Sequence, residues 1–131
     1  MRIGIDIVDI SRFQLVVQRT PRVLQRVFTD RERDYCMAKG NPYPSLAARF
    51  AAKEAFRKIH PDLSRGIRFQ EVEVRVDEWG RPGLVLWGNA LQSWQALGFI
   101  SLDLSLSHSR EQAIAAVIAK GGDKTDESGT G

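Results

Sequence analysis

The first ten residues alternate between two kinds of position. Ile3, Ile5 and Ile7 fall on one side of the alternation, and Asp6 falls on the other. Period-two spacing is typical of a β-strand that buries one face. The pattern predicts a strand with its isoleucines in the core and Asp6 on the opposite face.

Apolar residues from Ser11 to residue 59 recur at helical spacing instead. The pattern predicts helices over residues 11–19, 21–28, 30–39 and 46–59. Thr29 and Glu32 have the spacing of a capping box at the start of the third helix, and Gly40 suits a position just after its end. Ser45 is the expected N-cap of the fourth helix.

The second half of the chain contains mostly strand patterns. Strands are predicted over residues 69–77, 84–87, 100–108 and 113–119, with one helix from Asn89 to residue 97. Because strands and helices separate by region, an α+β fold is favoured over a βαβ arrangement. Residues 120–131 have no large apolar side chain, so we expect one domain over residues 1–119 and a flexible polar tail over 120–131.

Two acids interrupt these apolar patterns. Leu46, Phe50 and Glu54 are four residues apart, so Glu54 lies on the helix stripe expected to face the core. Burying an unpaired carboxylate is costly, so a cation, a metal ion or strong hydrogen-bond donors should lie opposite it. The alternative is an ordinary pair with Lys58, one turn along the helix.

Asp6 breaks the first strand in the same way. It could simply face solvent, or it could meet Glu54 if the strand packs against the alanine-rich helix. Two carboxylates without Cys or His partners suit Mg²⁺, which keeps waters and shares its remaining positions with phosphate oxygens. His108 continues the apolar face of the strand over 100–108, where a buried core histidine is the commoner case.

Composition narrows the class of protein. The 131 residues include 19 Lys and Arg against 16 Asp and Glu, a formal charge of +3. No apolar run is long enough to span a membrane, and the N-terminus does not resemble an export signal. The single cysteine, Cys36, excludes an internal disulfide and a multi-cysteine zinc site. We expect a cytoplasmic protein.

Three segments together resemble the family of holo-[acyl-carrier-protein] synthases, the small bacterial type of 4′-phosphopantetheinyl transferase. They are IGIDIVDISRF at residues 3–13, SLAARFAAKEAFRK at 45–58 and SLSHS at 105–109. The segments have the family's order and spacing, and the resemblance extends over residues 1–119. It implies the family's α+β fold, with helices packed on a small, mainly antiparallel sheet.

The resemblance also implies a Mg²⁺-dependent reaction that serves fatty acid biosynthesis. A serine hydroxyl of apo acyl carrier protein attacks the β-phosphorus of coenzyme A, which yields holo-acyl carrier protein and adenosine 3′,5′-bisphosphate. Asp6 and Glu54 would be the metal ligands, and Glu54 and Lys58 the catalytic residues. The expected coenzyme A contacts are Arg49, Lys53, Lys58 and His108. Whether metal-held water or Glu54 acting through water takes the serine proton is left open.

The family resemblance also supplies partners. Arg12 matches the family's carrier-docking arginine, with Arg19, Arg22 and Arg26 as additions that would attract an acidic carrier protein. A homotrimer is expected by analogy, with Asp6 and Glu54 from one chain and part of the coenzyme A pocket from its neighbour.

Two other classes of function were weighed against this one. A different Mg²⁺-dependent pyrophosphate or phosphoryl hydrolase could use the same two acids and would need no carrier protein. A nucleic-acid-binding module is suggested by the arginines between residues 12 and 33, but it lacks interleaved aromatic residues and leaves the two acids unexplained.

Overall fold

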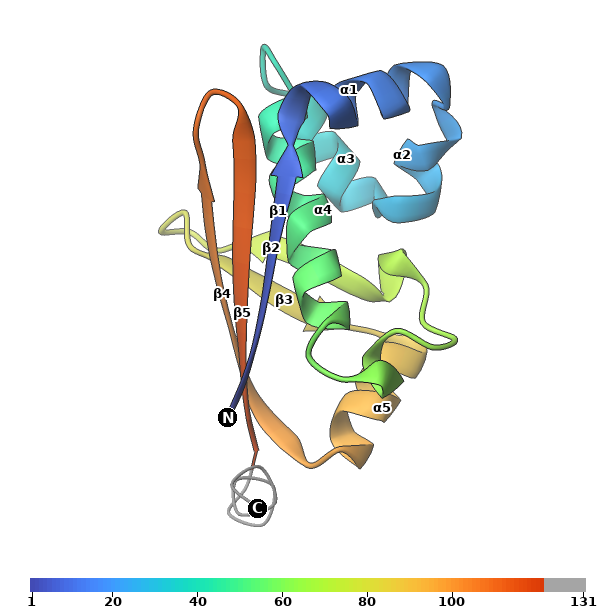
Figure 1. Ribbon diagram of the computed structural model, residues 1–131, viewed down its shortest axis with the longest axis vertical. Helices are drawn as coiled ribbons and strands as arrows, with labels where there is room; N and C mark the ends of the chain where they lie inside the picture. The colour runs from blue at the N-terminus through green and yellow to red at the C-terminus, as the bar shows by residue number, and fades with distance from the viewer. Residues whose placement is uncertain (122–131) are drawn as a thin grey trace.

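The strands of this protein form two separate antiparallel sheets (Figure 1). The computed structural model describes residues 1–121. β1 (Arg2–Asp9), β5 (Gln112–Gly121) and β4 (Phe99–His108) lie side by side in that order. β2 (Val72–Val76) and β3 (Pro82–Leu86) form a hairpin of their own. This arrangement confirms the α+β class.

Helices cover one face of the three-stranded sheet. The helices are α1 (Ile10–Arg19), α2 (Arg22–Val27), α3 (Asp30–Met37), α4 (Tyr43–Arg57) and α5 (Gly88–Ala96). The long helix α4 runs along the sheet, with α1, α2 and α3 near one end and α5 near the other (Figure 1). Short 3-10 turns, η1 (Pro61–Leu63) and η2 (Phe69–Glu71), connect α4 to β2. No helix within residues 1–121 has the length and apolar character needed to cross a membrane.

The structure contains some of the helix caps that the sequence predicted and lacks others. The capping box of Thr29 and Glu32 is confirmed, with both reciprocal hydrogen bonds present. Ser45 is not a cap, because α4 begins two residues before it, at Tyr43. Pro44 is tolerated there because it lies in the first turn of the helix. The sequence also predicts Asn89 as the N-cap of the next helix, but α5 begins at Gly88, so Asn89 lies in its first turn and its N–H donates to the Glu71 carboxylate over 2.6 Å.

The prediction for the faces of β1 was wrong. Ile3, Ile5 and Ile7 do share a face opposite Asp6, but they are 54%, 54% and 56% exposed. The other face, which carries Gly4, packs against α4 because a glycine lets the helix backbone come close. Alternation identified the strand, but both faces carry apolar residues, so it did not identify which one the helix covers.

The strands of the second half correspond to their predicted positions with shifted ends. β4 begins one residue early, and a register shift between Phe99 and Ser101 turns Phe99 into the core and leaves Ile100 76% exposed. β5 continues through Gly121, so the first two residues assigned to the tail belong to a strand. The rest of that predicted tail lies outside the described residues.

Candidate active site

A close backbone contact brings β1 against α4. An ideal β-carbon on Gly4 would lie 1.9 Å from the carbonyl oxygen of Ala55, so only glycine fits at this position. Asp6 is two residues along the same face of β1, and Glu54 precedes Ala55 on α4. The contact therefore brings the two carboxylate-bearing segments together.

Asp6 and Glu54 open into one surface cleft of about 570 Å³. Its remaining lining residues are Ile7, Val8, Asp9, Arg12, Phe13, Val16, Phe50 and Gln112. Asp9 accepts hydrogen bonds from the backbone N–H of Arg12 and from the Ser11 hydroxyl, which lower the pKa of its carboxyl group. Asp9 is thus committed to capping α1, which leaves Asp6 and Glu54 as the acids available to a ligand in the cleft.

Lys58 pairs with Asp6 and not with Glu54. Its Nζ lies 2.7 Å from Asp6 Oδ1 and 3.1 Å from the carbonyl oxygen of Ile5. The simple intrahelical pair of Glu54 and Lys58 is therefore not formed, and the Glu54 carboxylate has no hydrogen-bond partner among residues 1–121. The alternative of a solvent-facing Asp6 is also wrong, since its side chain is only 14% exposed.

The donors of this cleft fit a hard divalent cation. Residues 1–121 contain no cluster of three or more Asp, Glu, His or Cys side chains able to enclose a metal ion. Two carboxylates at the edge of an open cleft instead suit Mg²⁺, which is commonly held by one or two carboxylates together with waters and phosphate oxygens.

Arg49 and His108 come together in a second cleft, of about 460 Å³. His108 is exposed at the end of β4, so it is not the core histidine that its apolar neighbours favoured. Arg49 is 4% exposed; its Nη1 donates to the Ser45 hydroxyl over 2.7 Å, and its guanidinium lies over the Tyr35 ring. Its Nε has no partner within the described part of the chain. The positive charges of Arg49 and Lys39, which both line this cleft, suit an anionic ligand.

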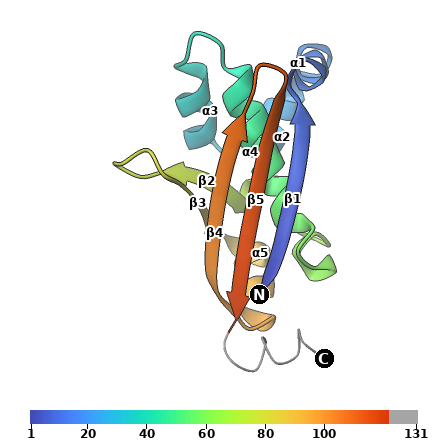
Figure 2. The same cartoon turned by 60° about the vertical axis from the view of Figure 1, so that its left-hand side comes forward.

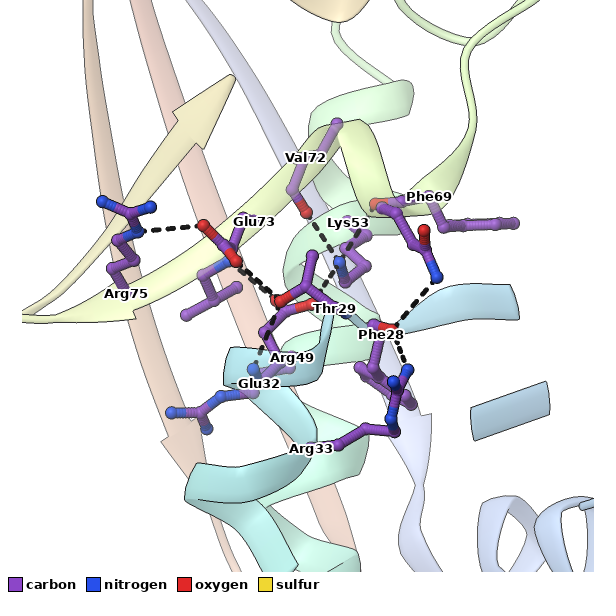
Figure 3. Close-up of polar contacts among 12 residues, drawn as sticks. Phe28, Thr29, Glu32, Arg33, Arg49, Lys53, Phe69, Val72, Glu73 and Arg75 are labelled. Atoms are coloured by element: carbon purple, nitrogen blue, oxygen red, sulfur yellow. Dashed lines mark hydrogen bonds and ion pairs between the residues drawn. The ribbon is translucent and has the colours of Figure 1, made fainter. Parts of the chain in front are cut away.

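Lys53 does not line either cleft, which corrects the expectation that it contacts coenzyme A. It is fully buried, and its ammonium donates to Glu32 Oε1, Phe69 O and Val72 O at 2.8, 3.0 and 2.7 Å (Figure 3). Burial lowers the pKa of Lys53, although the Glu32 carboxylate opposes that shift. With three donors satisfied, Lys53 ties α4 to α3 and to the start of β2.

The arginines proposed for docking lie at exposed positions of α1 and α2. They are Arg12, Arg19, Arg22 and Arg26. Arg12 borders the cleft of Asp6 and Glu54, whereas Arg26 borders a separate hollow that it shares with Arg68, Phe69 and Gln70. The structure thus places one of the four arginines beside the carboxylates.

Several residues around the clefts had not been singled out from the sequence. Gln112 borders the carboxylate cleft because it pairs with Asp9 between β5 and β1. Lys39 and Tyr35 border the Arg49 cleft. Gly4 was the one such residue with a readable signal, since a glycine inside a strand often marks a close backbone approach. The others depend on pairing and packing that a pattern of hydrophobic residues does not encode.

Comparison with known proteins assigns this chain to a family. A model of the 4′-phosphopantetheinyl transferase superfamily matches residues 2–117, which include both clefts. This chain belongs to that superfamily. Among relatives called holo-[acyl-carrier-protein] synthase, that of Halothermothrix orenii is 44% identical over 121 residues, covering 92% of this chain and 97% of its own. That of Trichlorobacter lovleyi is 45% identical over 118 residues, covering 88% and 94%.

Solved structures of the superfamily share the architecture. The crystal structure of holo-[acyl-carrier-protein] synthase from Helicobacter pylori in complex with coenzyme A superposes with a TM-score of 0.74 at 31% identity. The match covers 90% of this chain and 99% of that one. The phosphopantetheinyl transferase fold expected from the sequence is therefore confirmed.

Proposed function

We propose that this protein transfers 4′-phosphopantetheine from coenzyme A to a serine of apo acyl carrier protein. The observation that carries the proposal is the pair of carboxylates, Asp6 and Glu54, in one cleft of a chain that belongs to the 4′-phosphopantetheinyl transferase superfamily. Relatives called holo-[acyl-carrier-protein] synthase support the carrier as acceptor, and a coenzyme A complex among them supports the donor. The reaction would serve fatty acid biosynthesis in the cytoplasm.

Asp6 and Glu54 would hold Mg²⁺ in this proposal. When bound, the ion would supply positive charge to the pyrophosphate and offset the negative charge that develops as the bond breaks. Their exposure to the cleft supports the assignment, because substrate oxygens must reach the same ion.

Lys58, which pairs with Asp6, and Glu54 would act on the substrates directly. The serine oxygen forms a bond to the β-phosphorus, and the bond from that phosphorus to the bridging oxygen breaks, releasing adenosine 3′,5′-bisphosphate. Lys58 would stabilise charge on the pyrophosphate oxygens as this happens. The Glu54 carboxylate, which has no partner within residues 1–121, would accept the serine proton directly or through water.

The cleft of Arg49 and His108 would bind the phosphates of coenzyme A. The two clefts share no lining residue within one chain, and in this proposal a second copy would bring its coenzyme A cleft to the carboxylates of the first. Helices cover only the other face of the three-stranded sheet (Figure 2), and the exposed side chains of Ile3, Ile5 and Ile7 support an oligomer because a group of exposed apolar residues favours contact with another protein. We therefore propose a homotrimer with active sites between subunits.

The arginines Arg12, Arg19, Arg22 and Arg26 would dock the carrier. All four side chains are exposed, and positive side chains attract an acidic partner and speed its encounter. Arg12 supports this proposal most directly, because it borders the cleft where the carrier's serine must arrive.

The transfer is tested by the intact mass of apo acyl carrier protein after incubation with this protein, coenzyme A and Mg²⁺. A gain of one phosphopantetheine group, lost with EDTA and in Glu54→Gln, is the expected result. Cleavage of coenzyme A with no change in the carrier's mass would favour the hydrolase instead. No change in either substrate would contradict both.

The oligomer is tested separately by sedimentation of the wild-type chain and Ile5→Lys. A charge in the middle of the exposed isoleucine face should convert trimers to monomers and remove transfer activity. A wild-type chain that sediments as a monomer while fully active would contradict the intersubunit site.

A further inference from the structure

One of the two carboxylates of this cleft is already paired with a cation of the protein itself. The Lys58 ammonium lies 2.7 Å from Asp6 Oδ1, and its hydrogen bond to the carbonyl of Ile5 at 3.1 Å holds it there. Asp6 and Glu54 share the cleft, but among residues 1–121 a cation pairs with Asp6 and not with Glu54.

The two partners of this ion pair differ in freedom. The Asp6 side chain is 14% exposed on a strand that is fixed against α4, whereas the Lys58 side chain is 53% exposed. Lys58 is the C-cap residue of α4, and its long side chain extends from the end of the helix. The carboxylate is therefore the fixed partner and the ammonium the movable one. A half-exposed pair of this kind is weak enough to exchange.

A divalent cation on Asp6 and the ammonium in its present position exclude each other. Both cations would compete for the same carboxylate group, and like charges at ion-pair distance repel strongly. Metal binding must therefore release Lys58. The released ammonium stays tethered beside the cleft, where a phosphate oxygen would be its natural partner.

We propose that Lys58 is a placeholder for the metal ion, and that the metal releases it to bind the pyrophosphate of coenzyme A. This inference rests on the proposed function, because it takes Asp6 as a metal ligand and coenzyme A as substrate. It adds that one side chain couples the two binding events. Metal bound first makes Lys58 available to coenzyme A, and by reciprocity coenzyme A that holds Lys58 favours the metal.

The first test measures metal binding alone. Mn²⁺, a paramagnetic substitute for Mg²⁺, is titrated into the protein without coenzyme A, and free Mn²⁺ is measured by electron paramagnetic resonance. Lys58→Met removes the competing ammonium, so Mn²⁺ should bind about 3- to 5-fold more tightly, the change expected for loss of a partly exposed ion pair. Lys58→Arg keeps the charge and should stay within about 2-fold of wild type.

Removing any positive charge near the site also raises metal affinity, so a matched control is needed. Arg12 borders the same cleft but does not pair with Asp6, and Arg12→Gln measures that general effect. The proposed role of Lys58 predicts that the affinity for Mn²⁺ rises less in Arg12→Gln than in Lys58→Met. Equal gains in the two variants, or no gain in Lys58→Met, would overturn the proposal.

The second test measures the coupling by calorimetric titration of coenzyme A with and without Mn²⁺, in the absence of carrier. Mn²⁺ should raise coenzyme A affinity less in Lys58→Met than in wild type, and an equal rise would overturn the inference. The transfer assay keeps the two levels distinct. If the wild-type chain transfers phosphopantetheine but the binding tests fail, the proposed function stands and the proposed role of Lys58 is overturned. A chain that binds no Mn²⁺ loses both the metal site and the placeholder.

Discussion

Gly4 on β1 faces the backbone carbonyl of Ala55 on α4 at a distance that leaves no room for a side chain. A β-carbon at position 4 would lie 1.9 Å from that oxygen and 2.9 Å from its carbon. Asp6 lies two residues after Gly4, and Glu54 directly precedes Ala55. This steric contact therefore sets the relative position of the two acids.

Gly4→Ala should therefore reduce both stability and activity. The added methyl group must push β1 away from α4, and overpacking of this kind costs about 1–3 kcal/mol of unfolding free energy. Transfer activity should fall further than the folded fraction, because the carboxylates move apart. Urea unfolding and turnover of the same sample measure the two effects.

Gly83→Ala is the matched control for that substitution. Gly83 also lies in a strand, but a β-carbon there would contact nothing within 4 Å. Its unfolding free energy should change by no more than about 0.5 kcal/mol. Equal losses in the two variants would contradict the steric argument.

Lys53→Met should lower the stability of the protein without changing its binding of coenzyme A. The substitution leaves the fully buried Glu32 carboxylate without its cation, which costs about 3–5 kcal/mol for a buried pair. The double variant Lys53→Met, Glu32→Gln should regain part of that loss, because the uncompensated charge is removed. Urea unfolding of both variants measures the cost and the recovery.

The KM for coenzyme A separates this role from a binding role. Where the double variant is folded, its KM should match wild type, since Lys53 has no exposed atoms and three satisfied donors. Lys120→Met, an exposed change on β5, is the stability control. A large rise in KM in a folded variant would restore Lys53 to the coenzyme A site.

Local patterns predicted the elements of this fold better than their packing. The capping box of Thr29 and Glu32 was correct because it depends on residues close in sequence. The buried face of β1 was wrong because its alternation places isoleucines on one side and Gly4 and Val8 on the other, and only the packing of α4 decides between them. The isoleucines that looked like core form an exposed surface in the single chain.

The sequence predicted the two acids of the candidate site correctly, but it did not predict the position of Lys53. Asp6 and Glu54 were identified as acids that interrupt apolar elements, and the structure places both in one cleft. Lys53 was assigned to coenzyme A from the family resemblance alone, whereas the structure buries its side chain in the interior. Its partner Glu32 is 21 residues away, and the sequence contains no local sign of that long-range pair.

The stability of the protein should fall in acid through Glu71. Burial raises the pKa of this carboxyl group, but hydrogen bonds from the backbone N–H groups of Arg68, Asn89 and Ala90 outweigh burial, and the pKa lies below its ordinary value of 4.5. The unfolded chain therefore binds the proton first as the pH falls. The stabilisation is complete above about pH 4.5 and is lost progressively below it, as the pH falls through the lower pKa of the folded state.

Urea unfolding between pH 7 and pH 3 measures this loss. Glu71→Gln removes the titrating group at the start of α5, so its unfolding free energy should depend less on pH over the acid range. Glu78→Gln, in the exposed hairpin turn, should keep the wild-type profile. A Glu71→Gln profile parallel to wild type would show that other carboxyl groups cause the acid loss.

Arg12→Glu should weaken the use of the carrier protein selectively. Reversing a charge beside the cleft replaces attraction with repulsion toward an acidic partner, so the KM for apo carrier should rise about 10-fold or more, and its dependence on salt should weaken. The KM for coenzyme A should change little. Arg65→Glu, an exposed change near η1, is the control for overall charge. An equal effect of the two variants would place the docking surface elsewhere.

His108→Gln should weaken the use of coenzyme A and leave the use of the carrier protein unchanged. His108 is exposed at the rim of the Arg49 cleft, so the substitution removes a ligand contact without disturbing the core. If this cleft holds a part of coenzyme A remote from the reacting phosphorus, the KM for coenzyme A should rise about 5- to 10-fold while kcat stays nearly constant. Steady-state kinetics at saturating carrier measure the two constants. A fall in kcat with an unchanged KM would instead place His108 near the reacting atoms and contradict the assignment of this cleft to coenzyme A binding alone.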